Sequence, residues 1–250
     1  MPLAHRRTYP RRVTAPPPPP LPDEAGTAAL PLFPLGTVLF PGLMLPLHIF
    51  EERYRALMRS IIERPDGERR EFGVVAIRRG WEVEQASSTV SLYDVGCTAE
   101  VRRVTEHPDG TFDIVTVGGR RFTIADLLSV DTPYLQAQVR YLPENPGPEG
   151  DAEMLAPRVL AAFGRYLRLV RVNAADIPEQ LPEDPHVLSH LVAATANLTI
   201  AERQSLLATE DTPTRLRKEL VLLYREVGLL SQVRAVPVTV ADLPVRPGPN

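Results

Sequence analysis

The stretch LPLFPLGTVLFPGLMLPLHIFEERYRALMRS, residues 30–60, combines extended apolar runs, a Pro-Gly turn and an amphipathic segment. Prolines and a glycine interrupt its first runs. Residues 30–35 and 37–40 are therefore predicted to form short strands at a sheet edge or rim, where a missing N–H is tolerated. Pro41-Gly42 is predicted to turn the chain, and residues 44–50 to form a second, more buried strand.

A helix is predicted directly after these strands. From Glu51 the apolar period changes from two to about 3.6 residues. Glu51 and Glu52 fall in its first turn, where the helix dipole favours carboxylates. Six residues share the predicted apolar face: Phe50, Tyr54, Leu57, Met58, Ile61 and Ile62.

Strand-like runs continue through the first half of the chain, and an antiparallel sheet is predicted from them. The runs are residues 72–78, 96–106, 111–117, 120–127 and 134–142. Residues 107–110 (HPDG) are a turn, and Gly118-Gly119 suits a two-residue hairpin with positive φ. Phe112 and Phe122 point inward by alternation. Consecutive hairpins with one apolar face predict a sheet that curls or closes into a barrel.

Residues 143–150 (PENPGPEG) mark the clearest internal boundary, because the periodicity changes there from strand-like to helical. Beyond it, helix starts are marked by Asp184-Pro185, by the capping-box pair Thr199 and Glu202, and by Thr212-Pro213. The sequence thus predicts an α+β protein, with a β-barrel over residues 28–145 followed by an α-helical bundle over 151–234.

The two ends of the chain are rich in proline. Residues 1–27 hold arginine pairs and five consecutive prolines, and they are predicted to be disordered because they carry few apolar groups to bury. A polyproline II ligand for an SH3-like partner is the alternative to a plain spacer there. Residues 235–250 are predicted to form a loose tail.

Composition points to a soluble protein of the cytoplasm. The chain has 250 residues, of which 44% are hydrophobic, and a formal net charge of −3, so it has no global attraction to nucleic acid or anionic lipid. Cys97 is the only cysteine, which excludes an intramolecular disulfide. No apolar run is long enough for a membrane span or a secretory signal, so neither a membrane partner nor export is expected.

The opening stretch closely resembles the amino-terminal domain of the Lon protease family, with its pattern LPL.PL...VLFPG...PL.IFE.RY..L. Later segments keep to the family's strands: LYDVG at 92–96, AEVRRV at 99–104, GRRF at 119–122 and YLQAQV at 134–139. The resemblance extends to about residue 230. It implies a barrel similar to the PUA type and a domain that binds unfolded or tagged polypeptides or presents them to a protease.

In full-length Lon proteases this domain precedes an ATPase and a serine-lysine peptidase, and the motifs of both are missing here. Lys218 is the only lysine, and Arg217 and Glu219 flank it, so it is not the lysine of a P-loop. No G-x-S-x-G elbow occurs in the sequence either. A lysine must be desolvated to act as a base, whereas Lys218 is predicted on a solvated helix face. The protein is predicted not to be an enzyme and to need no cofactor.

Two residue pairs that contain histidine are candidate sites. His186 and His190 lie four residues apart on a predicted helix, at metal-ligand spacing, but no third ligand and no H-E-x-x-H glutamate is visible. Ordinary surface histidines are favoured, and no metal site is predicted. His48 and Glu51 flank the start of the first helix, where an architectural role is favoured over an acid–base pair.

Arginines could form a basic surface on the barrel. Arg102, Arg103, Arg120 and Arg121 fall on neighbouring predicted strands, and PUA-type barrels occur in RNA-modifying proteins. The aromatic residues that would stack on bases are sparse, at 6% of the chain. Salt-bridged solvated strands are favoured, and nucleic acid is disfavoured as a partner.

A polypeptide-binding site is predicted at Phe40, Leu43 and Met44, because large apolar residues interrupt turn chemistry there. Capping of the barrel by the same side chains is the alternative, and Met44 is the most adaptable candidate for peptide contact. The predicted function is non-catalytic recognition of unfolded or tagged polypeptides. An RNA-binding module and a hydrolase with an unrecognised site are the alternatives.

Overall fold

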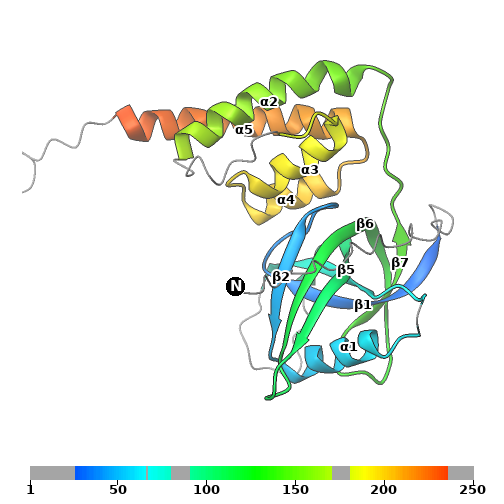
Figure 1. Ribbon diagram of the computed structural model, residues 1–250. Helices are drawn as coiled ribbons and strands as arrows, with labels where there is room; N and C mark the ends of the chain where they lie inside the picture. Colours follow the sequence, from blue (N-terminus) through cyan, green and yellow to red (C-terminus); the bar gives the residue numbers. More distant parts are fainter. Residues whose placement is uncertain (1–25, 66, 80–90, 171–180, 236–250) are drawn as a thin grey trace, which may run out of the picture.

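A ring of β-strands lies below a layer of helices in the computed structural model, which describes residues 26–65, 67–79, 91–170 and 181–235 (Figure 1). The strands are β1 (Thr27–Leu35), β2 (Met44–Ile49), β3 (Glu71–Arg79), β4 (Ser91–Leu92), β5 (Val95–Glu106), β6 (Phe112–Leu128) and β7 (Gln136–Tyr141). The helices are α1 (Glu52–Ile62), α2 (Asp151–Val170), α3 (Pro185–Thr195), α4 (Ile200–Leu207) and α5 (Thr212–Ala235). The proline-rich head and tail lie outside the described residues, except for Gly26, Thr27 and Ala235.

The strands follow the order β1-β7-β6-β5-β3-β4, and an additional pairing of β1 with β3 closes the ring. All neighbours are antiparallel except β1 and β3, which run parallel. The predicted α+β class with a near-closed antiparallel sheet followed by helices is confirmed. The prediction that residues 30–35 form an edge strand is wrong, because β1 is paired on both sides. Burial of five consecutive residues in β1, from Leu30 to Pro34, outweighs the two N–H donors missing at its prolines.

The segment from residue 37 to residue 50 differs from its prediction in two respects. Residues 37–40 form no strand, although Val38, Leu39 and Phe40 are buried. Strand β2 was expected to be the more buried one, but its burial alternates and, among the described strands, it pairs only with β6. It is therefore a half-exposed edge strand, which explains how it accommodates Pro46.

Strand β6 replaces two predicted strands. Gly118-Gly119 lies inside a continuous strand of 17 residues, and neither glycine has a positive φ. A Cβ at Gly118 would overlap the carbonyl oxygen of Phe40, and one at Gly119 would lie 2.5 Å from Thr98 Oγ1. The two glycines thus permit close packing instead of turning the chain. The turn at residues 107–110 is confirmed, with Gly110 at φ 77° and its N–H donating to His107.

Helix α1 covers the lower end of the ring (Figure 1). Its buried face consists of Tyr54, Leu57, Met58 and Ile61, and the Tyr54 ring stacks on Phe33 of β1 with centroids 4.0 Å apart. Phe50 and Ile62 were predicted on this face, but the structure leaves them exposed. The helix begins one residue later than predicted, since Glu51 is its N-cap and makes no side-chain capping bond.

The other helices form the upper layer, in which α2 and α5 lie side by side and α3 and α4 lie between them and the sheet (Figure 1). Two helix starts are confirmed, since Asp184 caps α3 and Thr199 with Glu202 forms a capping box on α4. The start of α5 differs by one residue, because Asp211 accepts the Thr214 N–H at 2.7 Å. No described helix is long and apolar enough to cross a membrane.

One hydrophobic cluster extends from the sheet into the helices, and it contains both Phe40 and helix residues such as Leu207 and Leu216. Cys97 belongs to it, and burial raises the pKa of its thiol, as fits a small hydrophobic core residue. The predicted division at residues 143–150 stays a prediction, and so do the domain bounds drawn from it.

Candidate functional site

The outer side of strand β2 carries an exposed apolar surface, which we call the β2 face and define as Met44, Pro46, His48 and Phe50. Burial alternates along this segment, so these four side chains point away from the core while Leu45, Leu47 and Ile49 turn inward. Met44 is 72% exposed and Phe50 is 63% exposed, unusual values for such large apolar groups.

The structure separates the three residues predicted to bind polypeptide. Phe40 is fully buried and lies against His190 with ring centroids 6.0 Å apart, so it caps the barrel and cannot contact a peptide from solution. Leu43 is half-buried, and only Met44 is open to solvent. The sequence missed Phe50 because the helical period beginning there placed it on the buried face of α1. The strand alternation from Met44 was the signal that could have found it.

His48 also lies on the β2 face, where it joins a small polar cluster. Its Nδ1 is 2.7 Å from one carboxylate oxygen of Asp113, and Nε2 of His107 is 2.7 Å from the other. These hydrogen bonds, the one from His48 first, lower the pKa of Asp113. Glu51, considered as a partner of His48, instead pairs with Arg53.

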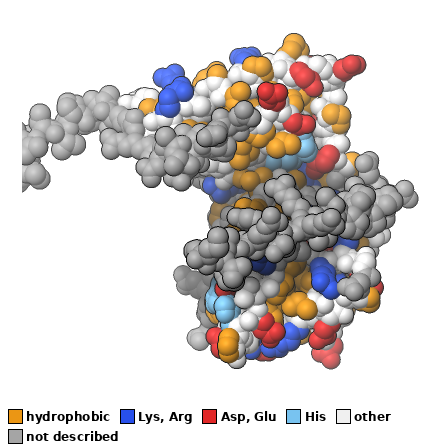
Figure 2. All heavy atoms as spheres, in the orientation of Figure 1, with side chains coloured by type: hydrophobic (Ala, Val, Ile, Leu, Met, Phe, Trp, Pro, Cys, Tyr) orange, Lys and Arg blue, Asp and Glu red, His pale blue; other side chains and the backbone are white. Residues whose placement is uncertain are grey.

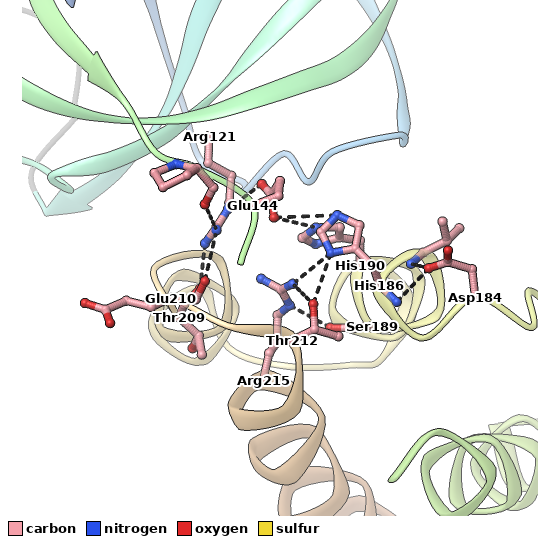
Figure 3. A network of polar contacts seen from close by, with 12 residues as sticks. Arg121, Glu144, Asp184, His186, Ser189, His190, Thr209, Glu210, Thr212 and Arg215 are labelled. Atoms are coloured by element: carbon pink, nitrogen blue, oxygen red, sulfur yellow. Dashed lines mark hydrogen bonds and ion pairs between the residues drawn. The ribbon is translucent and has the colours of Figure 1, made fainter. Parts of the chain in front are cut away.

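A second cluster of polar residues lies at the junction of sheet and helices (Figure 3), with Arg121 of β6 at its centre. Its side chain is only 1% exposed. Its guanidinium donates to Glu144 Oε1 at 2.8 Å and to the carbonyls of Leu207 and Thr209 at 2.9 and 2.6 Å. Further bonds reach two more carbonyls, those of Pro143 and Glu210. One buried arginine therefore ties the sheet to the end of α4 and to the predicted linker.

Glu144 places its second carboxylate oxygen beside the two histidines of α3. Glu144 Oε2 lies 3.5 Å from His186 Nε2 and 4.0 Å from His190 Nε2. The prediction of ordinary surface histidines is wrong for His190, which is 2% exposed. The sequence showed no third ligand because Glu144 lies 42 residues before His186, and only the fold brings them together.

Helix α5 contributes Arg215 to the same junction. Its Nε donates to Ser189 Oγ at 2.6 Å, and Ser189 Oγ donates to Glu219 at 3.0 Å. Burial lowers the pKa of Arg215 to about 10, so it stays charged at neutral pH, and burial raises the pKa of Glu219 well above its usual value. Arg215 NH2 lies 3.5 Å from His186 Nδ1.

The four arginines considered for RNA do not form one basic surface. Arg121 is buried, and Arg120 lies over the Tyr141 ring at 3.5 Å and pairs with Glu71. Arg102 is exposed and pairs with Glu100. Lys218 is exposed as predicted, and its ammonium donates to Thr209 Oγ1 at 3.0 Å.

His190 is predicted to make the protein sensitive to mild acid. Burial lowers its pKa from 6.5 to about 2, and Arg215, His186 and Arg121 act in the same direction. Glu144, the carboxylate that faces it among the described residues, is 4.0 Å away. Below about pH 6.5 the unfolded chain binds a proton here and the folded chain does not, so stability falls by up to about 1.4 kcal/mol per pH unit.

Urea unfolding at a series of pH values between about 6.5 and 5 measures this slope. In His190→Leu the free energy of unfolding should fall less steeply with acid than in the wild type. Parallel curves for the two proteins contradict the assignment of the slope to His190.

Comparison with known proteins identifies the family of the chain. Residues 29–225 match the family model described as the ATP-dependent protease La (LON) substrate-binding domain. Lon protease 2 of Herpetosiphon aurantiacus is 34% identical over 211 residues, which are 83% of this chain and 25% of that protein. Lon protease of Porphyromonas gingivalis is 28% identical, over 77% of this chain and 23% of its own length. The chain thus spans about a quarter of the length of these curated relatives.

Two solved structures share the fold. The Lon N-terminal domain protein from Xanthomonas campestris superposes with a TM-score of 0.52 at 24% identity, covering 78% of this chain and 98% of that one. The N-terminal domain of Mycobacterium avium complex Lon protease gives a TM-score of 0.58 at 20% identity, covering 80% and 98%. With a family model that spans most of its length, the chain belongs to the family of Lon substrate-binding domains.

Proposed function

We propose that this protein is a non-catalytic recognition domain that binds unfolded or tagged polypeptides through the β2 face. The observation that carries the proposal is the exposure of two large apolar side chains, Met44 on the edge strand β2 and Phe50 directly after it. Presentation of the bound chain to a protease is part of the same proposal, and the match to the Lon substrate-binding domain supports it. Figure 2 shows apolar side chains on the exposed surface of the sheet.

The geometry of β2 suits an extended guest. Among the described strands β2 pairs only with β6, so its other edge is available to hydrogen-bond a polypeptide backbone. Pro46 lacks an N–H at the middle of that edge, which limits indiscriminate pairing with other sheets. Met44 adds a flexible, polarisable surface that adapts to different side chains.

Met44→Asp and Phe50→Asp are expected to weaken binding of an unfolded protein about tenfold or more each. Burial of one such side chain is worth roughly 1.5–3 kcal/mol, and a charge forfeits that gain. Because both side chains are exposed, the melting temperature should change little. Isothermal titration with a chemically unfolded protein measures the affinity.

Met154→Asp on α2 is the matched control, since Met154 is 69% exposed and lies outside the β2 face. Unchanged affinity in both β2-face variants, or an equal loss of affinity in the control, contradicts the proposal that the β2 face binds polypeptide. Titration with single-stranded RNA at two salt concentrations tests the alternative, an RNA-binding module. Steep salt dependence with RNA and no heat with polypeptide favours an RNA module.

A further inference from the structure

Three side chains from two separate segments converge at the junction of sheet and helices. Glu144 comes from the segment after β7, and His186 and His190 come from successive turns of α3 (Figure 3). Their nearest ligand atoms all lie within 4.8 Å of one another. The hydrogen bonds and ion pairs of these three side chains do not fully explain why they converge.

His190 supplies the independent sign that a ligand belongs here. It is 2% exposed, and neither ring nitrogen has a hydrogen-bond partner among the residues that the structure describes. A buried polar group left unpaired costs about 1–3 kcal/mol, so such groups are rare in folded proteins. Its Nε2 faces Glu144 Oε2 across 4.0 Å, a gap too long for a hydrogen bond.

We propose that Glu144, His186 and His190 form a binding site for a divalent transition-metal ion, with Zn²⁺ the ion that best fits these ligands. Two imidazoles and one carboxylate are the ligand set of open, three-ligand zinc sites. The histidines are four residues apart on α3, which places both on one face of the helix.

The distances agree with an ion between the three side chains. Zinc bonds of about 2.0–2.2 Å in tetrahedral geometry place neighbouring ligand atoms roughly 3.3–3.6 Å apart. The distances from Glu144 Oε2 to the two imidazole nitrogens are 3.5 and 4.0 Å. Small rotations of the side chains would close the site without a change in the backbone.

Neighbouring groups already hold two of the ligands in place. Arg121 fixes Glu144 through its Oε1 and leaves Oε2 facing the histidines. Thr212 Oγ1 lies 3.2 Å from His186 Nδ1, which leaves Nε2 directed at Glu144. Hydrogen bonds of this kind set the orientation of metal ligands.

A cavity of about 420 Å³ gives access to the site and a place for a fourth, water ligand. Glu144 and His186 line it, together with three further acidic side chains, Glu149, Glu153 and Asp184. In Figure 2 a histidine is visible at the base of the helical layer with acidic side chains nearby. The acidic walls draw cations in, whereas Arg121 and Arg215 repel them and limit the affinity.

The cluster of His48, His107 and Asp113 was the other candidate, and it fits a metal less well. Both carboxylate oxygens of Asp113 are already hydrogen-bonded to imidazole nitrogens at 2.7 Å, so no described ring nitrogen that faces Asp113 lacks a partner. It therefore supplies the control for the experiment.

The full chain, freed of metal with a chelator, is titrated with Zn²⁺ by calorimetry and with Co²⁺ by visible absorption, which reports the coordination geometry. We expect one ion per chain and a higher melting temperature with Zn²⁺. His186→Asn and His190→Leu should each weaken binding about 100-fold or more, because even loss of a hydrogen bond to a ligand costs about 10–100-fold. The double variant H48N/H107N should bind as the wild type does.

Absence of Zn²⁺ and Co²⁺ binding by the wild type overturns the proposal, as does binding that His186→Asn and His190→Leu leave intact. Loss of binding in H48N/H107N assigns the ion to the β2 face instead and also overturns it. Circular dichroism of each metal-free variant checks folding. If His190→Leu does not fold, the half-exposed His186 decides the question alone.

Discussion

Arg121→Met is expected to lower the free energy of unfolding by about 3–5 kcal/mol, the typical cost of removing one partner of a buried ion pair. The Arg121 side chain is 1% exposed and donates to Glu144 and to four backbone carbonyls. Methionine keeps much of the volume but leaves these acceptors without their donor. Buried acceptors that lose their donor pay the full cost of desolvation.

Urea unfolding of Arg121→Met and the wild type measures the loss. Arg102→Met is the matched control, because Arg102 lies on the neighbouring strand in an exposed pair with Glu100 and should cost less than about 1 kcal/mol. Arg121→Lys keeps the charge without the planar fork of donors, so it should fall between the two. Similar stabilities for Arg121→Met and Arg102→Met contradict the view that Arg121 joins sheet to helices.

Local sequence signals correctly predicted the features that depend on residues close together in the chain, namely helix caps and a turn. The caps at Asp184 and Thr199 are confirmed because a capping residue and its N–H partner are two or three residues apart. The turn at residues 107–110 is confirmed because the positive φ that it requires falls on Gly110, a residue that adopts this conformation without strain. The near-closed sheet was predicted from the run of hairpins with one apolar face, and the family resemblance implied the same barrel.

Features set by distant partners could not be predicted in this way. A Gly-Gly sequence occurs both in hairpin turns and where other atoms pack closely against a strand. Gly118-Gly119 is an example of close packing, which the sequence alone does not distinguish from a turn. The arginines looked alike in sequence, yet Arg121 is buried and Arg102 is exposed, because only Arg121 has helix carbonyls above it.

The candidate sites show the same difference between locally determined features and features set by distant residues. Met44 is exposed, as its place beside a Pro-Gly turn suggested, and its role in binding polypeptide stays a prediction. Phe40 was misplaced because its burial depends on α3, 150 residues later, where His190 lies against it. Glu144 was missed as a neighbour of the histidines for the same reason.

Gly118→Ala is expected to destabilise the protein by about 3 kcal/mol, at the upper end of the cost of overpacking. The added methyl would overlap the carbonyl oxygen of Phe40, and it would lie 2.9 Å from the carbonyl carbon. Both obstacles are backbone atoms, so no rotamer change relieves the overlap. Gly118 also accepts from Gly42 N–H and donates to the Leu43 carbonyl, each at 2.8 Å, so a shift breaks the hydrogen bonds that hold the turn before β2.

Gly36→Ala is the control, because its Cβ would meet nothing within 4 Å and its φ is not positive. It should be neutral or raise stability by about 0.4–1 kcal/mol through a less flexible unfolded chain. Urea unfolding measures both variants, and titration with an unfolded protein below the unfolding transition measures their affinity. If the β2 face binds polypeptide, Gly118→Ala should lose affinity as well as stability, because its damage reaches the turn that positions Met44. If Gly118→Ala is as stable as Gly36→Ala, the expected overlap is contradicted, because β6 must then be able to move at this point, as a hairpin turn could.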